Sequence, residues 1–220
     1  MLGFNRMHKK ETGDTLIEVL FAMTVFSFIV VTALSLMNQG VAAAQRSLEI
    51  TTVRQQMDGQ AETLRFLHQS YVESFQVGQT FNLTDTLSTP AEEYYRIIQH
   101  LKDPLTGNRQ SVSAFFGPAP CAVPSDPNTD FIMNPIFAKL APAASRPTLF
   151  KKATTYSQIT YSTGNTLSES QGLWIEALRS PGSGTAPGYI DFHIRACWNV
   201  SGSDLPMKLG TIVRLYEPRG

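Results

Sequence analysis

A run of 27 residues without a charged side chain, residues 19–45, constrains this chain more than any other feature. Leu, Val, Phe, Ile and Ala predominate in the run, and Lys9 and Lys10 lie a few residues before it. As an α-helix rising about 1.5 Å per residue, such a run can cross a hydrocarbon layer of about 30 Å. We therefore predict a membrane-spanning segment over residues 16–38.

Glu18 is the single charged residue inside the apolar segment that begins at Leu16. A carboxylate in a membrane-spanning helix is unfavourable by about 2.5–3.5 kcal/mol at mid-bilayer and by less toward the interface. A simple anchor gains nothing from this side chain, so Glu18 indicates a function beyond anchoring. The alternative is a glutamate that merely tolerates a position at the membrane interface.

The residues around Glu18 form a recognisable pattern. Residues 9–13 read KKETG, residues 15–20 read TLIEVL, and the apolar run follows without interruption. This arrangement resembles the class III signal of type IV pilins and pseudopilins, which has a basic leader, a Gly at the cut and a Glu as fifth residue of the mature chain. The resemblance covers about a quarter of the chain. It implies a leader over residues 1–13, a cut between Gly13 and Asp14, and Glu18 as the fifth mature residue.

The resemblance also implies a function and a set of partners. The chain would be a structural subunit, cut by a prepilin peptidase and delivered by an inner-membrane assembly platform to a filament of like or related pilin subunits. Glu18 would pair with the new amine at Asp14 of a neighbouring subunit. Filaments of this family serve adhesion, twitching motility, DNA uptake or protein secretion. No catalytic residue and no cofactor is implied, and we expect no enzyme activity.

Two departures from the family pattern favour a minor or divergent pilin. Asp14 stands where major pilins usually have the Phe that the processing peptidase methylates on its amine. Ser27 and Ser35 stand where major pilins carry helix-weakening Gly and Pro residues. We therefore expect a more continuous anchor helix than theirs.

The distribution of basic residues on either side of the apolar run predicts the membrane topology. Arg6, Lys9 and Lys10 precede the apolar run, and the next basic residue is Arg46, so the positive-inside rule keeps the leader cytoplasmic and sends the rest outward. We expect a single-pass protein of the cytoplasmic membrane before assembly and an extracellular filament after it. One alternative is a secretory signal cut after residues 42–44, which read AAA. Another is a single-pass anchored domain that binds a ligand or acts as an enzyme without polymerising.

Helical periodicity continues beyond the apolar run. Gly78 is a stop signal for a helix, and no Pro interrupts residues 14–77, so one helix is predicted over this whole range. An apolar stripe with spacings of three or four indicates that its second half is amphipathic and packs on a domain. The stripe comprises Val53, Met57, Ala61, Leu64, Leu67, Tyr71 and Phe75, with the glutamines at 55, 56 and 60 largely off it.

The remainder, residues 78–220, is predicted to be an extracytoplasmic domain of α+β class. A short helix over residues 91–102 has a capping box, Thr89 with Glu92, and Pro90 at its start. A Pro-rich loop with little regular structure is expected over 103–150, followed by antiparallel strands between residues 154 and 216. The expected strands are 154–161, 173–177, 190–198 and 211–216, arranged as a meander on the amphipathic half of the long helix. His193, opposite the apolar face of its strand, is expected to be solvated.

The two cysteines, Cys121 and Cys197, are the only ones in the chain. In a domain outside the membrane they are a candidate disulfide; the alternative is two unpaired buried thiols. They do not indicate zinc, and no histidine lies at a metal-ligand spacing from Cys or Glu, so no metal site is expected. A formal net charge of zero gives no overall attraction to nucleic acid. Arg46, Arg54 and Arg65 are the candidates for local contacts with DNA or neighbouring subunits, and the alternative is a solvated helix face.

Overall fold

The structure is a computed structural model in which the chain divides into two compact units, Met1–Leu48 and Glu49–Gly220. It describes residues 14–76, 81, 88–100, 115–117, 119–122, 124, 130–141, 146–180, 182, 186–200 and 203–218. The predicted leader, residues 1–13, and Gly78 lie outside the described residues. The helices are α1 (Asp14–Ser74), α2 (Pro90–His100) and α4 (Arg146–Leu149). The strands are β1 (Asp130–Phe131), β2 (Met133–Asn134), β3 (Lys139–Leu140), β4 (Phe150–Lys151), β5 (Gln158–Tyr161), β6 (Leu167–Gln171), β7 (Leu173–Ser180), β8 (Tyr189–Asn199) and β9 (Pro206–Tyr216).

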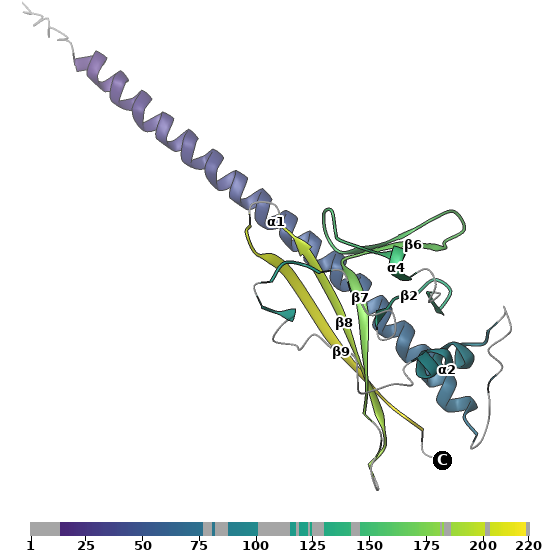
Figure 1. The fold of residues 1–220 in the computed structure, drawn as a ribbon. Helices are drawn as coiled ribbons and strands as arrows, with labels where there is room; N and C mark the ends of the chain where they lie inside the picture. The colour runs from purple at the N-terminus through teal and green to yellow at the C-terminus, as the bar shows by residue number, and fades with distance from the viewer. Residues whose placement is uncertain are drawn as a thin grey trace, which may run out of the picture. The chain divides into compact units, whose positions relative to one another are not determined.

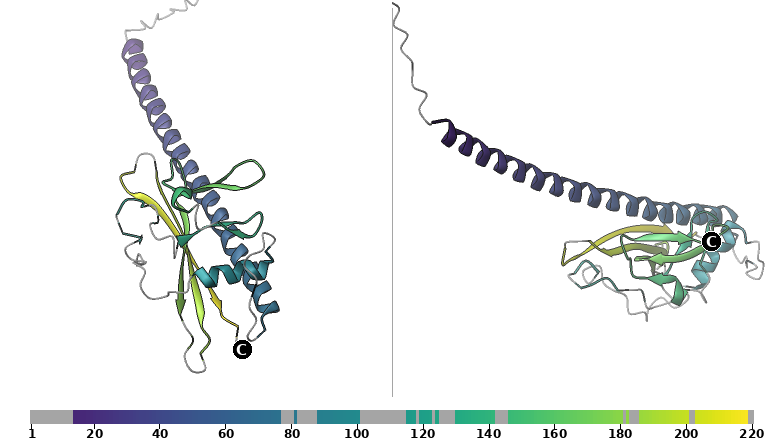
Figure 2. Two further views of the ribbon diagram at one scale, coloured as in Figure 1. Left: turned by 45° about the vertical axis from the view of Figure 1, so that its right-hand side comes forward. Right: turned by 90° about the horizontal axis from the view of Figure 1, so that it is seen from above.

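Helix α1 has the two characters that the sequence predicts. It begins at Asp14 and ends at Ser74, slightly before the predicted end at 77. In the second compact unit, the predicted stripe is the buried face of the helix: Val53, Met57, Ala61, Leu64, Leu67 and Tyr71 are buried, and Phe75 is half-buried. The strands lie on one side of this half of the helix (Figure 2).

Two glutamines of α1 contact strand backbone instead of solvent. Gln60 is completely buried; its side-chain amide donates to the carbonyl of Met133 (2.9 Å) and accepts from the Met133 N–H (3.0 Å). One turn earlier, the side-chain amide oxygen of Gln56 accepts a hydrogen bond from the backbone N–H of Ile159 (2.7 Å). Both glutamines therefore satisfy strand groups that would otherwise be left without a partner in the interior.

Helix α2 forms with the predicted capping box. The Glu92 N–H donates to the Thr89 hydroxyl (3.3 Å), and the Thr89 N–H donates to the Glu92 carboxylate (2.6 Å). Tyr94 of α2 packs on Tyr71 of α1 with ring centroids 5.3 Å apart, and α2 lies across the C-terminal end of α1 (Figure 1). The helix begins at Pro90, and residues 101 and 102, which complete the predicted helix, lie outside the described residues.

The main sheet has the strand order β1-β7-β8-β9, and all its pairs are antiparallel. Strands β7, β8 and β9 form a meander, as predicted, and run side by side in Figure 1. Each is longer than its predicted range. On β8, the inward residues Ile190, Phe192, Ile194, Ala196 and Trp198 are buried toward α1.

The prediction of a purely antiparallel meander needs two corrections. The fourth strand of the main sheet is β1, whereas β5, predicted as that strand, belongs to a separate sheet of order β4-β6-β5. In that sheet β4 pairs with β6 in parallel. The sequence did not indicate β6, because its residues Leu-Ser-Glu-Ser-Gln carry little apolar signal.

The prediction of a loop with little regular structure over residues 103–150 is wrong in its second half. Strands β1, β2 and β3 and helix α4 lie there, and β2 and β3 form an antiparallel hairpin. The reason is a short apolar run, residues 131–133, whose side chains are fully buried. Elements of two residues have no period to detect, so the Pro and Asn residues around them dominated the prediction.

Candidate functional site

The first half of α1 presents apolar side chains on all sides. Within the described residues there is one candidate membrane span, in Leu16–Ser74, and none of its most apolar window is buried. The exposed side chains include Leu16, Ile17, Val19, Leu20, Phe21, Met23, Phe26, Phe28, Ile29, Val31, Leu34, Leu36 and Met37. So much exposed apolar surface is unfavourable in water, so this segment needs lipid or other apolar helices around it.

Three hydroxyl groups of this half, those of Thr24, Ser27 and Thr32, are hydrogen-bonded within the helix. Thr24 donates to the carbonyl of Phe21 (2.7 Å), and Ser27 donates to the carbonyl of Met23 (2.8 Å). Thr32 donates to carbonyls one turn earlier in the same way. Hydroxyls bonded to their own helix need no water, which suits a hydrocarbon environment.

Glu18 differs from these residues. Its side chain is exposed, and within the part of the chain that the structure describes it makes no hydrogen bond or ion pair. Asp14, the first helical residue, lies one turn before it, about 6 Å along the helix axis. The structure thus brings Asp14 and Glu18 to one end of α1, while Gly13, the third residue of the predicted processing site, lies outside the described residues.

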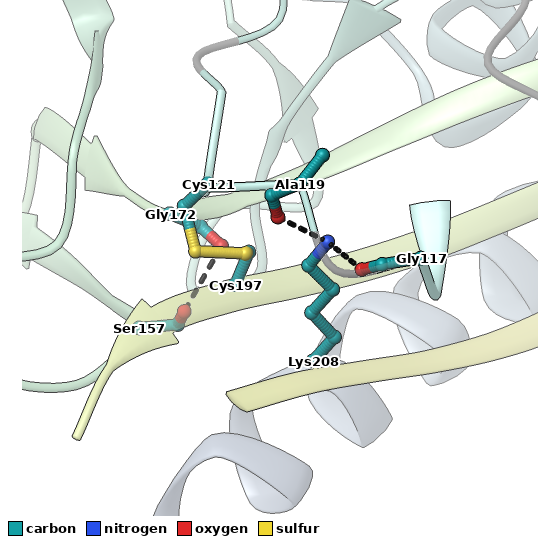
Figure 3. Close-up of a disulfide and its surroundings, with 7 residues drawn as sticks. All are labelled: Gly117, Ala119, Cys121, Ser157, Gly172, Cys197 and Lys208. Carbon is teal, nitrogen blue, oxygen red and sulfur yellow. Dashed lines mark hydrogen bonds between the residues drawn. A yellow bond between two sulfur atoms is a disulfide. The ribbon is translucent and has the colours of Figure 1, made fainter. Parts of the chain in front are cut away.

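The candidate disulfide is confirmed. Cys121 and Cys197 are joined, with their Cα atoms 5.6 Å apart (Figure 3). The bond fixes residues 115–117 and 119–122, which we call the strap, to the outer face of β8. Lys208 of β9 adds a second attachment, because its ammonium donates to the carbonyls of Gly117 (2.8 Å) and Ala119 (2.7 Å). The Pro-rich segment is therefore held near Cys121, as predicted.

Gly172 makes the close approach beside the disulfide possible. Its φ of 66° lies in the left-handed region, and a Cβ at this position would be 2.3 Å from the carbonyl oxygen of Cys197. The Cys197 N–H and the Ser157 hydroxyl both donate to the Gly172 carbonyl (2.8 and 3.0 Å). Figure 3 shows the Ser157 hydroxyl directed at Gly172 beside the disulfide. Only glycine has both the backbone freedom and the absence of a side chain that this position requires.

A buried charged group lies beneath the strap. Arg195 is 4% exposed, with its guanidinium 3.0 Å from the Glu176 carboxylate and 4.8 Å from the centre of the Phe115 ring. The Trp174 indole N–H donates to the same carboxylate (3.1 Å). Burial lowers the pKa of Arg195, and the nearby carboxylates of Glu176 and Asp130 oppose that shift.

This group corrects the expectation for the outer face of β8. His193 is half-buried beside Phe115 and Phe116 instead of being solvated, and Arg195 is buried. The alternation of polar and apolar residues correctly separated the two faces of the strand. It gave no sign that a distant segment covers the polar face. The cysteine at 197, on that same face, was the available signal.

The chain was compared with protein-family models, with curated proteins and with solved structures, and nothing matches.

Proposed function

We propose that the chain is a type IV pilin-like subunit. It is made as a precursor with its leader in the cytoplasm, and a prepilin peptidase cuts it between Gly13 and Asp14. The mature chain stays in the cytoplasmic membrane through the first half of α1 until it is assembled into an extracellular filament. Its role is structural, and its partners are the peptidase, other pilin subunits and the assembly platform.

Three observations support the proposal. The TLIEVL motif follows Gly13-Asp14 and precedes the apolar run. The first half of α1 exposes its apolar side chains in every direction, which fits a segment that moves from lipid to a bundle of sister helices. The Cys121–Cys197 disulfide fits an oxidising compartment outside the cytoplasm.

The observation that carries the proposal is Glu18, a carboxylate that makes no hydrogen bond or ion pair among the described residues. It lies one turn from the residue that would become the N-terminus. Cleavage creates an amine at Asp14, and an amine entering an apolar filament core needs a negative partner. An unpaired buried charge is unfavourable by several kcal/mol, whereas a paired one can roughly break even. The pair of Glu18 with a neighbour's amine therefore sets the register of subunits more than their stability. Asp14 contributes a second carboxylate beside the amine, so part of the amine's charge is compensated without Glu18.

The test replaces Glu18 and follows three steps separately: membrane insertion, cleavage and incorporation into sheared filaments. Glu18→Ala inserts and is cleaved, but its incorporation falls sharply because the neighbour's amine loses its partner. Glu18→Gln rescues poorly, since it keeps the shape and loses the charge. Thr24→Ala is the matched control in the same apolar half, because its hydroxyl bonds only within its own helix. Normal incorporation of Glu18→Ala contradicts the mechanism.

A further inference from the structure

A cavity of about 180 Å³ lies in the second compact unit where α1, α2, β7 and the segment after β9 meet. Its lining includes Tyr71 and Phe75 near the end of α1, Tyr94 and Ile98 of α2, Arg179 of β7, and Glu217. Pockets for drug-sized ligands measure about 300–1,000 Å³, so this cavity fits a single small ring. The processing site and the disulfide contribute none of these residues.

The lining contains the hydroxyl groups of two tyrosines, Tyr71 and Tyr94. Tyr94 is 2% exposed and Tyr71 is 6% exposed, yet neither hydroxyl makes a hydrogen bond within the part of the chain that the structure describes. Neither hydroxyl oxygen is among the fully enclosed polar atoms that lack a partner, so both keep accessible surface, and a ligand in the cavity can supply their hydrogen bonds. Burial raises the pKa of both groups, Tyr94 most strongly, so both phenols keep their protons and can donate.

The charges of the cavity compensate each other. The Arg179 guanidinium donates to the Glu217 carboxylate over 2.6 Å, and both side chains are partly exposed. The pair offers donors and acceptors to a ligand without presenting a net charge. A charged ligand would have to compete with the existing ion pair, so the site favours a neutral molecule.

We propose that this cavity binds a neutral sugar ring, such as a hexose or N-acetylhexosamine unit. Tyr71, Phe75 and Ile98 contribute apolar side-chain surface to the lining, and the C–H face of a sugar can pack on such surface. The ring hydroxyls both donate and accept, which matches the two phenols and the Arg179–Glu217 pair. This inference goes beyond the proposed filament function and does not depend on it.

Saturation-transfer NMR on the full chain tests the inference. The protein is held in a detergent without a sugar headgroup, because a glycoside detergent would compete for the cavity. The probes are neutral hexoses and N-acetylhexosamines, with benzoate and zwitterionic phenylalanine as charged alternatives of similar ring size. We expect saturation transfer to the C–H protons of at least one neutral sugar and a dissociation constant in the millimolar range.

Two cavity variants separate binding from folding. Tyr94→Phe deletes one hydroxyl that makes no hydrogen bond to any residue the structure describes, so the melting temperature stays unchanged while sugar affinity falls about threefold or more. Glu217→Gln removes the charged acceptor and lowers affinity about tenfold. Tyr161→Phe removes a hydroxyl outside the cavity and serves as the matched control. The inference is overturned if no neutral sugar receives saturation, if only the charged probes do, or if Tyr94→Phe binds sugar as well as the unmodified chain.

Discussion

Gln60 and Met133 are joined by two hydrogen bonds across 73 residues of sequence: the glutamine amide donates to the Met133 carbonyl and accepts from the Met133 N–H. A helix side chain thereby bonds the backbone N–H and carbonyl of Met133, which a neighbouring strand would otherwise bond, in the two-residue strand β2. With Gln56 bonding Ile159 one turn earlier, α1 holds a strand from each of the two smaller sheets. The position of these sheets on α1 therefore depends on polar contacts as well as on the apolar stripe.

Replacing Gln60 by leucine tests this dependence. Glutamine and leucine have related shapes, but leucine leaves the buried Met133 N–H and carbonyl without a partner. Each unsatisfied group is unfavourable by about 1–3 kcal/mol, so the free energy of unfolding should fall by about 2–6 kcal/mol. Denaturant unfolding of the full chain in micelles measures the loss. Gln55→Leu, at an exposed position of the same helix, should change the free energy of unfolding by less than about 0.5 kcal/mol. Equal effects of the two substitutions would show that the Gln60 contacts do not stabilise the fold.

The disulfide closes a long loop, because Cys121 and Cys197 have a sequence separation of 76. In the chain-entropy model such a cross-link is worth about 4–5 kcal/mol. A reductant should lower the unfolding free energy of the native chain by about that amount and should make the strap accessible to proteases. The double variant Cys121→Ser, Cys197→Ser should have the lower unfolding free energy without any reductant, and adding reductant should not change it. If reduction changes neither unfolding nor proteolysis, the strap is held by Lys208 and packing alone.

Gly172 offers a test of the local geometry beside that disulfide. Gly172→Ala would place a methyl group against the Cys197 carbonyl and would force alanine into a left-handed backbone conformation. We therefore expect the free energy of unfolding to fall by more than about 2 kcal/mol. Gly164→Ala is the matched control: its φ of 80° is also left-handed, but nothing lies within 4 Å of the added Cβ. The free energy of unfolding of the control should fall by only about 1–2 kcal/mol, because alanine is unfavourable in the left-handed backbone conformation. Similar losses at both positions would mean that the contact with Cys197 is relieved by a small shift. Thermal or denaturant unfolding measures both.

The elements with a pattern repeated over many residues, or with a local capping signal, could be predicted from the sequence. The stripe from Val53 to Tyr71 repeats over five turns, and the capping box of Thr89 and Glu92 defines its helix by local chemistry alone. Residues 190–198 alternate strictly and form the centre of β8. In the stripe and in β8, a property repeated along one segment specifies the face that the segment buries, whereas the capping box specifies where its helix begins.

The contacts between distant segments could not be predicted in this way. Gln60 has the composition of a solvent-exposed helix residue, and only the position of Met133 explains its burial. Arg195 is polar in an alternating strand, and only the strap explains why it is buried. The disulfide is the exception, because a chain with two cysteines allows a single intramolecular pairing. Gly13, Asp14 and Glu18 are a separate case, because their proposed role involves an enzyme and neighbouring subunits.

The mature N-terminus tests the central claim most directly. The full chain is isolated from the membranes of cells that contain a prepilin peptidase, and its first residue is determined by mass spectrometry. We predict a chain that begins at Asp14, and a Gly13→Val variant that keeps the leader. A chain that begins at Gln45 would identify a secreted domain released by a signal peptidase. A native chain that retains residues 1–13 would leave an anchored domain that does not assemble, and either result would contradict the pilin account.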